Sequence, residues 1–429
     1  MLDIKYIRDH KEEVIHNNKQ RNKTVDIDQL LALDDEKNTL LKKAEDLRAE
    51  RNKRSKTKPS EEEIILMRKL GDEIAGFEDL VAEKDEELQE LLYALPNLTH
   101  PSVPEAPDES GNKILRTWGT PREFNFEPKD HLALGENLGI IDTQAAAEVV
   151  GSRFAYVKGK LALLQFALLN HAFSIITNQE KIDTIIKKNS LTVSNKPFTP
   201  VIPPVMIRPE IMHKMGRLEP REERYHIPSD DLYLVGSAEH TLGPLHMNKT
   251  FPAAELPVRY VGYSTAFRRE AGSYGKDTRG IFRVHQFDKL ELESFCLSEN
   301  SLAEQDLFVA IQEELMQTLE LPYQVVLKCT GDMGQPDYRE YDIETWIPSQ
   351  KQYRETHTSD LMTDFQSRRL NIRAKLADGT ISHVHMNDAT AYAMARTLIA
   401  LLENYQQADG SITVPTVLQK YTGFERIEK

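Results

Sequence analysis

Residues 267–291 read FRREAGSYGKDTRGIFRVHQFDKLE, and this segment is the most informative part of the chain. It places cations around a glycine-rich turn, two carboxylates near its ends and an aromatic ring beside the last cation. These residues are Arg268, Lys276, Arg279 and Arg283, Glu270 and Glu291, and Phe287. Guanidinium groups bind phosphate oxygens and a carboxylate pairs with an amine. Taken alone, the segment fits a solvated surface hairpin, but it also has the parts needed to hold ATP beside an amino acid.

Composition limits the class of protein. A chain of 429 residues is expected to form two or three domains with at least one large core. No apolar run reaches the roughly 18 residues of a membrane-spanning helix, and the charged N-terminus lacks a secretory pattern, so no membrane partner is expected. The two cysteines form neither a disulfide framework nor a zinc-ligand pattern, which favours the reducing cytoplasm. A net charge of -14 argues against DNA or nonspecific nucleic-acid binding, so an RNA partner needs a local basic patch.

Residues 30–54 and 67–95 carry apolar side chains at alternating steps of three and four. This pattern is typical of two long helices that pack on each other, with Lys37 and Lys84 as polar interruptions. A proline and a serine between the two runs predict a break. We therefore expect an antiparallel coiled-coil hairpin at about residues 28–95, about 50 Å long at roughly 1.5 Å per residue.

The far end of the expected hairpin is basic. Its cations are Arg48, Arg51, Lys53, Arg54, Lys56 and Lys58, with Glu50 as one nearby acid. On the pattern alone, a dimerisation coiled coil or a solvated spacer is as good an interpretation as a binding surface. A basic arm on an otherwise acidic chain favours a polyanion-binding arm.

A proline-rich segment at residues 96–104 ends the arm. Beyond it, helical stretches alternate with short β-rich runs, which predicts an α+β fold with a mostly antiparallel sheet flanked by helices. The helical stretches include residues 161–187 and 397–407, and the β-rich runs include 233–235, 324–327 and 341–346. The expected organisation is an N-terminal domain at residues 1–100, a linker at 101–115 and a second domain at 116–429.

Three further segments carry side chains suited to a small ligand. Ser237 and Glu239 offer a hydroxyl and a carboxylate to the ammonium of an amino acid. Glu355 can hold a magnesium ion together with substrate phosphates, and Arg396 can reach a phosphate from a helix. Each segment also fits an ordinary structural role. The first can be a simple turn, the second a strand whose histidine is hydrogen-bonded within the fold, and the third a packing helix with an exposed arginine.

The order and spacing of residues 267–291 resemble the second signature of class II aminoacyl-tRNA synthetases, and the seryl-tRNA synthetases carry a near match without gaps. The helical arm and residues 388–396, which resemble the third class II signature, extend this resemblance over nearly the whole chain. The resemblance implies a class II catalytic domain that uses ATP and Mg²⁺, activates L-serine and transfers it to tRNA.

The resemblance assigns roles residue by residue. Arg268 matches the arginine on the α-phosphate, Arg283 the arginine on the distal phosphates and Arg396 the clamp on the γ-phosphate; Glu270 completes the expected catalytic group. The expected ATP contacts are Arg268, Arg269, Glu270, Arg283, Phe287, Glu355, Thr356, His357, Thr358 and Arg396. The expected serine contacts are Ser237, Ala238, Glu239, Arg268, Glu291 and Thr390. Glu355 and Thr358 match the residues beside the metal.

The resemblance further implies tRNA(Ser) as a partner, tRNA(Sec) as a second candidate, and a homodimer built on the segment around Pro203. Some positions depart from the family pattern. Asp388 stands where asparagine is usual, His357 and Ser237 stand where serine and threonine are usual, and residues 359–361 replace Cys-Ser-Asn. These departures leave two alternatives open: an inactive RNA-binding paralogue, and an amino-acid:carrier-protein ligase, which is expected to lack the long arm.

Overall fold

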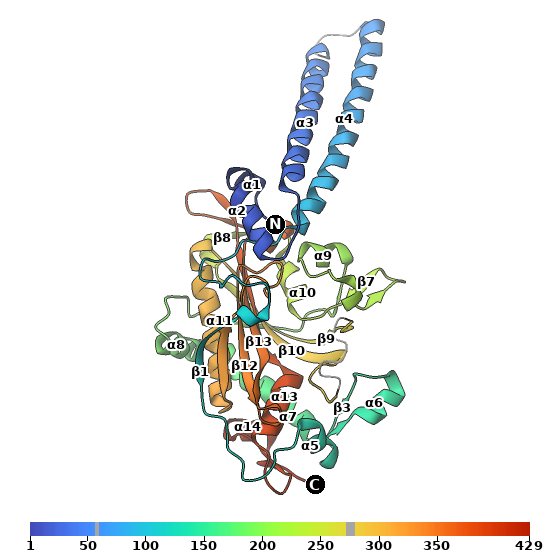
Figure 1. The fold of residues 1–429 in the computed structure, drawn as a ribbon. Coiled ribbons are helices and arrows are strands. Elements are labelled where there is room, and N and C mark those ends of the chain that lie inside the picture. Colours follow the sequence, from blue (N-terminus) through green and yellow to red (C-terminus); the bar gives the residue numbers. More distant parts are fainter. Residues whose placement is uncertain (56–59, 272–278) are drawn as a thin grey trace. The chain divides into compact units, whose positions relative to one another are not determined.

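The computed structural model describes residues 1–55, 60–271 and 279–429. Within these ranges the chain divides into two compact units, Met1–Leu98 and Thr99–Lys429 (Figure 1). Three cations singled out in the sequence lie outside the described residues. They are Lys56 and Lys58 of the arm and Lys276 of the glycine-rich turn.

The N-terminal unit is helical. Its helices are α1 (Ile4–Asp9), α2 (Lys11–Gln20), α3 (Ile27–Arg54) and α4 (Glu61–Ala94). Asp26 begins α3 by accepting a hydrogen bond of 2.9 Å from the backbone N–H of Gln29. Ser60 and Glu63 form a capping box at the start of α4, each satisfying a backbone N–H that the helix leaves free. Local capping thus sets where both long helices begin.

The predicted hairpin is confirmed, because α3 and α4 lie side by side and run antiparallel (Figure 1). Lys37 pairs with Asp85 at 3.1 Å, and Arg48 pairs with Glu78. Lys37, a polar interruption in the apolar stripe, therefore closes an ion pair across the hairpin. One apolar cluster joins the base of the hairpin to α1 and α2. Its buried residues are Leu2, Ile7, Val14, Ile27, Leu30, Leu33, Leu88, Leu92 and Leu95.

The second unit is built on an eight-stranded sheet of order β1-β11-β12-β13-β16-β10-β9-β4. Neighbouring strands are antiparallel, except that β4 and β9 are parallel. The predicted α+β class with a mostly antiparallel sheet is confirmed. The strands are β1 (Lys113–Trp118), β4 (Thr199–Val201), β9 (Val258–Phe267), β10 (Gln286–Cys296), β11 (Tyr323–Leu327), β12 (Arg339–Ile347), β13 (Gln352–Thr363) and β16 (His385–Ala393).

Helices flank this sheet, and α7, α11 and α13 bury apolar faces in the largest core of the unit (Figure 1). The helices are α5 (His131–Asn137), α6 (Thr143–Val150), α7 (Lys160–Ile176), α8 (Gln179–Lys188), α9 (Pro209–Lys214), α10 (Glu239–Leu242), α11 (Ser301–Thr318), α12 (Phe365–Leu370), α13 (Met394–Asn404) and α14 (Thr416–Thr422). Short strands form small additional sheets. They are β2 (Ile141–Asp142), β3 (Tyr156–Val157), β5 (Met206–Ile207), β6 (His226–Ile227), β7 (Leu232–Leu234), β8 (Thr250–Pro252), β14 (Arg373–Lys375), β15 (Ile381–His383), β17 (Ile412–Thr413) and β18 (Arg426–Ile427).

A buried glutamine of α11 ties this helix to two central strands. The side-chain amide of Gln312 donates to the carbonyl oxygen of Thr358 on β13 at 2.7 Å and to that of Thr390 on β16 at 2.8 Å. Hydrogen bonds from a buried amide to backbone carbonyls contribute to stability. The contact fixes the backbone behind two of the expected ligand residues.

The helix expected at residues 161–187 is wrong as a single element, because the structure divides it into α7 and α8. Asn178 accepts hydrogen bonds from the backbone N–H groups of Glu180 at 2.9 Å and Lys181 at 3.2 Å, and so begins a new helix. Among the described residues, no single helix has both the length and the apolar character to cross a membrane; α7 and α8 pass that test only as a pair bent by 76°.

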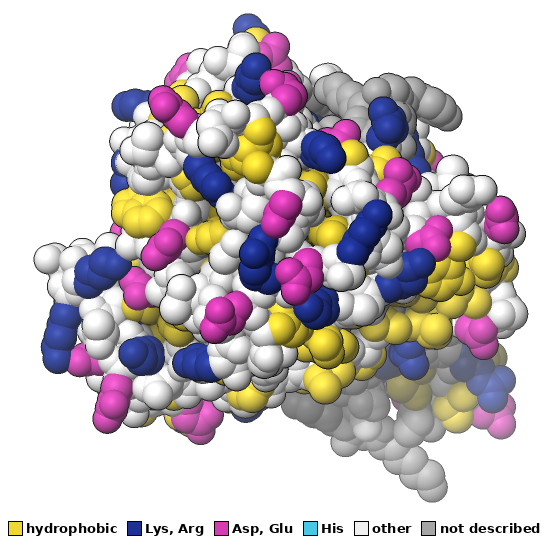
Figure 2. Space-filling model, turned by 90° about the horizontal axis from the view of Figure 1, so that it is seen from below, with side chains coloured by type: hydrophobic (Ala, Val, Ile, Leu, Met, Phe, Trp, Pro, Cys, Tyr) yellow, Lys and Arg dark blue, Asp and Glu magenta, His cyan; other side chains and the backbone are white. Residues whose placement is uncertain are grey.

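Charged side chains of both signs are interspersed with apolar ones on the face seen in Figure 2. No extended area of one sign is visible on that face. Several large apolar side chains are nevertheless exposed in the second unit. Ile202 is 86% exposed, directly after β4, and Phe166 and Leu163 on α7 are 54% and 52% exposed. Exposed apolar groups of this kind are candidates for contact with another chain.

Candidate active site

A cavity of about 320 Å³ opens in the second unit, lined by β10, β13, β16, the start of α13 and the segment after β9. Most of the ligand contacts expected from the sequence line it. They are Glu239, Arg268, Glu270, Arg283, Phe287, Glu355, Thr356, Thr358, Thr390 and Arg396. The fold therefore gathers side chains from distant parts of the sequence around one space.

Arg268, directly after β9, lies beside an aromatic ring. Its Nε donates to the carbonyl oxygen of Gly236 at 3.1 Å, which fixes the guanidinium. The guanidinium carbon lies 5.4 Å from the ring centroid of Phe287 on β10. A fixed cation next to an aromatic face suits a nucleotide, which carries a phosphate and a base.

Two further arginines of the cavity each pair with a carboxylate. Arg283 Nη1 lies 2.8 Å from Glu270 Oε2, and Arg396 Nη1 lies 2.7 Å from Glu355 Oε1. Both guanidinium side chains keep some exposure, 29% for Arg283 and 21% for Arg396. Because phosphate oxygens bind guanidinium groups in the same geometry as carboxylates do, these arginines can exchange one anionic partner for another.

A second group of residues is polar and almost fully buried. Ser237 Oγ donates to Glu291 Oε1 at 2.8 Å, and the Thr390 hydroxyl lies 3.5 Å from the same oxygen. Glu291 and Thr390 face each other across β10 and β16, and Lys289 pairs with Glu291. Burial raises the pKa of Glu291. Hydroxyls and a carboxylate shielded from water can recognise a small ligand that carries its own hydroxyl.

Glu239, at the start of α10, offers a negative charge to the cavity. Burial by itself would raise its pKa, but the positive charges of Arg217 and Lys289 lower the pKa to about 2. Glu239 is therefore ionised at neutral pH. A carboxylate in the wall of a cavity suits the ammonium group of an amino acid.

Glu355 and Thr358, on β13, are the expected metal neighbours, and both line the cavity. Partial burial opposes ionisation of Glu355, whose side chain is 45% exposed, but Arg396 and then Lys328 lower its pKa to about 2. The Thr358 hydroxyl lies 3.3 Å from that of Thr390. An ionised carboxylate and a hydroxyl are oxygen donors of the kind that Mg²⁺ accepts beside substrate phosphates, so the donor set fits this ion.

Comparisons with known proteins agree with this geometry. Residues 1–99 match the family model of the seryl-tRNA synthetase N-terminal domain, and residues 224–405 match that of the tRNA synthetase class II core domain for G, H, P, S and T. The serine–tRNA ligase of Symbiobacterium thermophilum is 39% identical over 438 residues, which is 100% of both chains. The chain belongs to the seryl-tRNA synthetase family.

Solved structures of the seryl-tRNA synthetase family resemble the chain over its full length. The crystal structure of seryl-tRNA synthetase from Pyrococcus horikoshii complexed with ATP has a TM-score of 0.87 and 38% identity, covering 100% of this chain and 99% of that one. The cytoplasmic serine–tRNA ligase of Naegleria fowleri in complex with AMP has a TM-score of 0.83 and 29% identity, with the same coverage. The family membership inferred from residues 267–291 is thus confirmed.

Some residues that the family resemblance assigns to ligands are not among those that line the cavity. These are Ser237 and Glu291, which pair with each other, and Ala238, Arg269 and His357. The guanidinium carbon of Arg269 lies 5.6 Å from the ring centroid of Tyr225. His357 is 1% exposed and packs near Tyr392, on the side of the sheet where Tyr392 meets α7. Burial lowers the pKa of His357 to about 3, so the ring is neutral.

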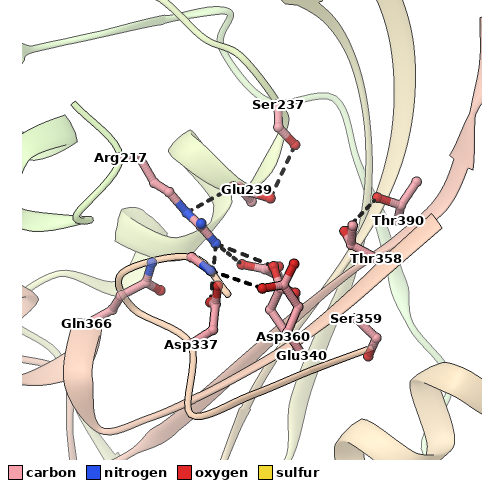
Figure 3. Close-up of polar contacts among 12 residues, drawn as sticks. Arg217, Ser237, Glu239, Asp337, Glu340, Thr358, Ser359, Asp360, Gln366 and Thr390 are labelled. Atoms are coloured by element: carbon pink, nitrogen blue, oxygen red, sulfur yellow. Dashed lines mark hydrogen bonds and ion pairs between the residues drawn. The ribbon is translucent and has the colours of Figure 1, made fainter. Parts of the chain in front are cut away.

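Two departures from the family pattern meet at an arginine that sequence reasoning missed. Figure 3 shows Arg217 pointing among Glu239, Asp337 and Asp360, and Arg217 also reaches Asp388. Arg217 lies in a stretch without a recognisable motif, and its partners come from separate elements. The unusual aspartates at 360 and 388 were the only signal in the sequence that pointed to this part of the site.

The basic end of the arm belongs to the N-terminal unit. Lys53 is exposed and Arg51 is half-buried. Arg48 pairs with Glu78, and Arg54 pairs with Glu50 at 2.7 Å. Because exposed ion pairs contribute little stability, a polyanion can take over these arginines at small cost. The four described cations at this end of the arm are therefore candidates for contact with RNA.

Proposed function

We propose that the chain is a serine–tRNA ligase, which activates L-serine with ATP to seryl-adenylate and pyrophosphate and then transfers the seryl group to tRNA(Ser). The observation that carries the proposal is the single cavity that Arg268, Arg283 and Arg396 share with Glu239 and Thr390. In support, relatives that match this chain over its whole length are serine–tRNA ligases.

In the first step, an oxygen of the serine carboxylate attacks the α-phosphorus of ATP, and the bond from that phosphorus to the bridging oxygen of pyrophosphate breaks. The phosphate oxygens carry the charge of the transition state. Arg268, Arg283 and Arg396 orient the phosphates and offset this charge, and Phe287 offers a face to the adenine. No protein base is needed, because the attacking carboxylate is already ionised.

In the second step, the terminal 3′ ribose hydroxyl of the tRNA attacks the seryl carbonyl carbon, and the bond from that carbon to the phosphate oxygen of the adenylate breaks. AMP leaves, and its phosphate takes up the hydroxyl proton. Selection of serine rests on Ser237, Glu291 and Thr390. Alanine has no hydroxyl to offer Glu291 Oε2, a buried oxygen without a hydrogen-bond partner among the described residues, whereas threonine is excluded by lack of space. Glu239 is the proposed partner of the serine ammonium.

Glu355 and Thr358 are the proposed contacts of Mg²⁺. The ion, when bound, supplies positive charge to the phosphates. The contribution of the chain is to keep Glu355 ionised, through the nearby charges of Arg396 and Lys328.

The remaining assignments follow the same proposal. Residues 1–100 form the tRNA-binding domain, 101–115 the linker and 116–429 the catalytic domain. The arm binds tRNA(Ser), with tRNA(Sec) as a second candidate, and the chain works in the cytoplasm as a homodimer. The tRNA contacts are Arg48, Arg51, Lys53, Arg54, Lys56 and Lys58.

ATP–pyrophosphate exchange with each of the twenty amino acids tests the first step, and serine alone is expected to support it. Arg268→Ala is expected to lower serine-dependent exchange by about 10²–10³ or more, because a cation aimed at the reacting phosphate is lost. The control variant Arg221→Ala, which changes an exposed arginine outside the cavity lining, is expected to lose less than about tenfold. Both variants should keep the melting temperature of the wild type.

Equal losses in the two variants, or exchange retained by Arg268→Ala, would contradict the role of Arg268. Tight binding of tRNA without any exchange would instead indicate an RNA-binding paralogue. Transfer of serine to a carrier protein rather than to tRNA would indicate an amino-acid:carrier-protein ligase.

A further inference from the structure

Arg217 follows α9 and meets carboxylates from four separate segments. Its Nε lies 3.1 Å from Glu239 Oε1 on α10, and its Nη2 lies 3.3 Å from Asp388 Oδ2 on β16. The same Nη2 lies 3.5 Å from Asp360 Oδ2 on β13 and 3.9 Å from Asp337 Oδ1 before β12. The side chain of Arg217 is only 15% exposed. One buried guanidinium thus links four acidic groups that are distant in the sequence.

Asp360 and Asp388 are direct partners across β13 and β16. They are 6% and 1% exposed. Like charges on facing positions of neighbouring strands repel each other, and burial raises the pKa of both carboxyl groups. Both residues are departures from the seryl-tRNA synthetase pattern. The structure therefore places a cation at the point where two unusual acids meet.

The same arginine connects to the amino-acid end of the cavity. While Glu239 Oε1 pairs with Arg217, Glu239 Oε2 lies 3.4 Å from Ser237 Oγ. Ser237 in turn donates to Glu291 at 2.8 Å. A continuous polar chain thus runs from Arg217 to the residues proposed to recognise serine.

Neighbouring lysines are engaged with other acids. Lys328 pairs with Glu340 at 2.9 Å and with Asp332 at 3.4 Å, and Lys289 pairs with Glu291. Loss of the charge at position 217 would leave the facing aspartates without their close guanidinium partner. Breaking a buried ion pair in this way is costly, because it leaves a buried charge uncompensated.

We propose that Arg217 is a positioning residue for the amino-acid substrate, which holds Glu239 at the serine end of the cavity. Through the same guanidinium it offsets the facing pair of Asp360 and Asp388, so that these departures are compensated and the site stays active. The inference rests on the proposed serine-activating function.

Steady-state exchange kinetics of Arg217→Gln test the inference. Glutamine keeps a polar side chain but removes the charge, so the KM for serine is expected to rise by about tenfold or more while the KM for ATP changes less than about twofold. The double variant Arg217→Gln/Asp388→Asn is expected to recover part of the serine KM, because it also removes one of the two facing carboxyl groups. The matched control Arg221→Gln changes an exposed arginine that pairs with Glu219, and it should behave as the wild type.

A serine KM that stays unchanged in Arg217→Gln, or that rises in parallel with the KM for ATP, would overturn the inference. If the melting curve shows that Arg217→Gln does not fold, Arg217→Lys is used in its place. A serine KM raised severalfold at constant ATP KM supports the positioning role of Arg217, and unchanged kinetics overturn it. A wild-type protein without serine-dependent exchange contradicts the proposed function, and the inference with it. If the wild type shows serine-dependent exchange but the KM values for serine and ATP rise in parallel in Arg217→Gln, only the inference is contradicted.

Discussion

At the scale of the residue, burial and neighbouring charge decide which groups are ionised. Glu239 keeps its charge because guanidinium and ammonium groups outweigh its burial. His171 on α7 shows the opposite balance. Burial, assisted by Lys420, lowers its pKa to about 4. Its ring nitrogens lie 3.2 Å from the hydroxyls of Tyr392 and Thr318, partners that a neutral imidazole can satisfy.

The shift at His171 predicts how stability depends on pH. The unfolded group has a pKa of about 6.5 and the folded group about 4, so unfolding takes up a proton between these values. The stabilising effect of the neutral ring is complete above about pH 6.5 and is lost as the pH falls towards 4. His171→Gln is expected to reduce the loss of unfolding free energy between pH 7 and pH 5 by about 2 kcal/mol.

Urea unfolding of both proteins at pH 7 and pH 5 measures this difference. His226→Gln is the control, because His226 is an exposed imidazole of the same unit. Replacing this exposed histidine, which pairs with Asp231, should not reduce the loss of stability between pH 7 and pH 5. If His171→Gln loses as much stability on acidification as the wild type, His171 does not account for the acid sensitivity.

At the scale of the element, the arm separates into a base and an outer part. Leu30, Leu33, Leu88 and Leu92 belong to the apolar core of the N-terminal unit. Further out, the buried residues on the hairpin are fewer; among the described residues they are Ala44, Leu70 and Ile74. A deletion can therefore remove the outer arm while the base keeps its core.

Replacing residues 38–84 by a short glycine-serine linker tests the arm as a separate RNA handle. Serine-dependent exchange is expected to stay within about twofold of the wild type, because the cavity belongs to the other unit. Charging of tRNA(Ser) is expected to fall by about 100-fold or more, because several phosphate-binding cations are lost. Equal loss of both activities would show that the arm also supports the catalytic unit.

At the scale of the whole molecule, an exposed apolar residue predicts self-association. Ile202 is 86% exposed directly after β4, next to the proline that resembles the family's dimer segment. In a homodimer this side chain would be buried, and a charge there would be costly. Ile202→Asp is expected to convert a dimer into a monomer, as measured by light scattering coupled to size-exclusion chromatography.

Ile65→Asp is the matched control for the dimer, since Ile65 is 59% exposed on α4 and lies in the N-terminal unit. That variant should remain a dimer. A wild-type protein that is monomeric at micromolar concentration, or an Ile202→Asp variant that stays dimeric, would contradict the proposed interface.

Features that depend on neighbours along the chain were determined by the sequence alone. The apolar stripes of α3 and α4 predict the hairpin because helix periodicity is a local property. Residues 267–291 point to the family because their order and spacing, both local properties, resemble the second class II signature. The single helix expected at 161–187 was wrong for a related reason: Asn178 can continue a helix or begin one, and its side-chain hydrogen bonds to Glu180 and Lys181 mark the actual break.

Tertiary structure alone decided which charges meet. Arg217 and Asp388 are 3.3 Å apart yet lie on elements distant in the sequence, so no spacing rule predicts their contact. The same holds for His357, whose orientation follows from the packing of β13 against its neighbours and the helices behind the sheet. Coulomb energy depends on distance in space and on burial, and both are set only when the strands and helices have come together.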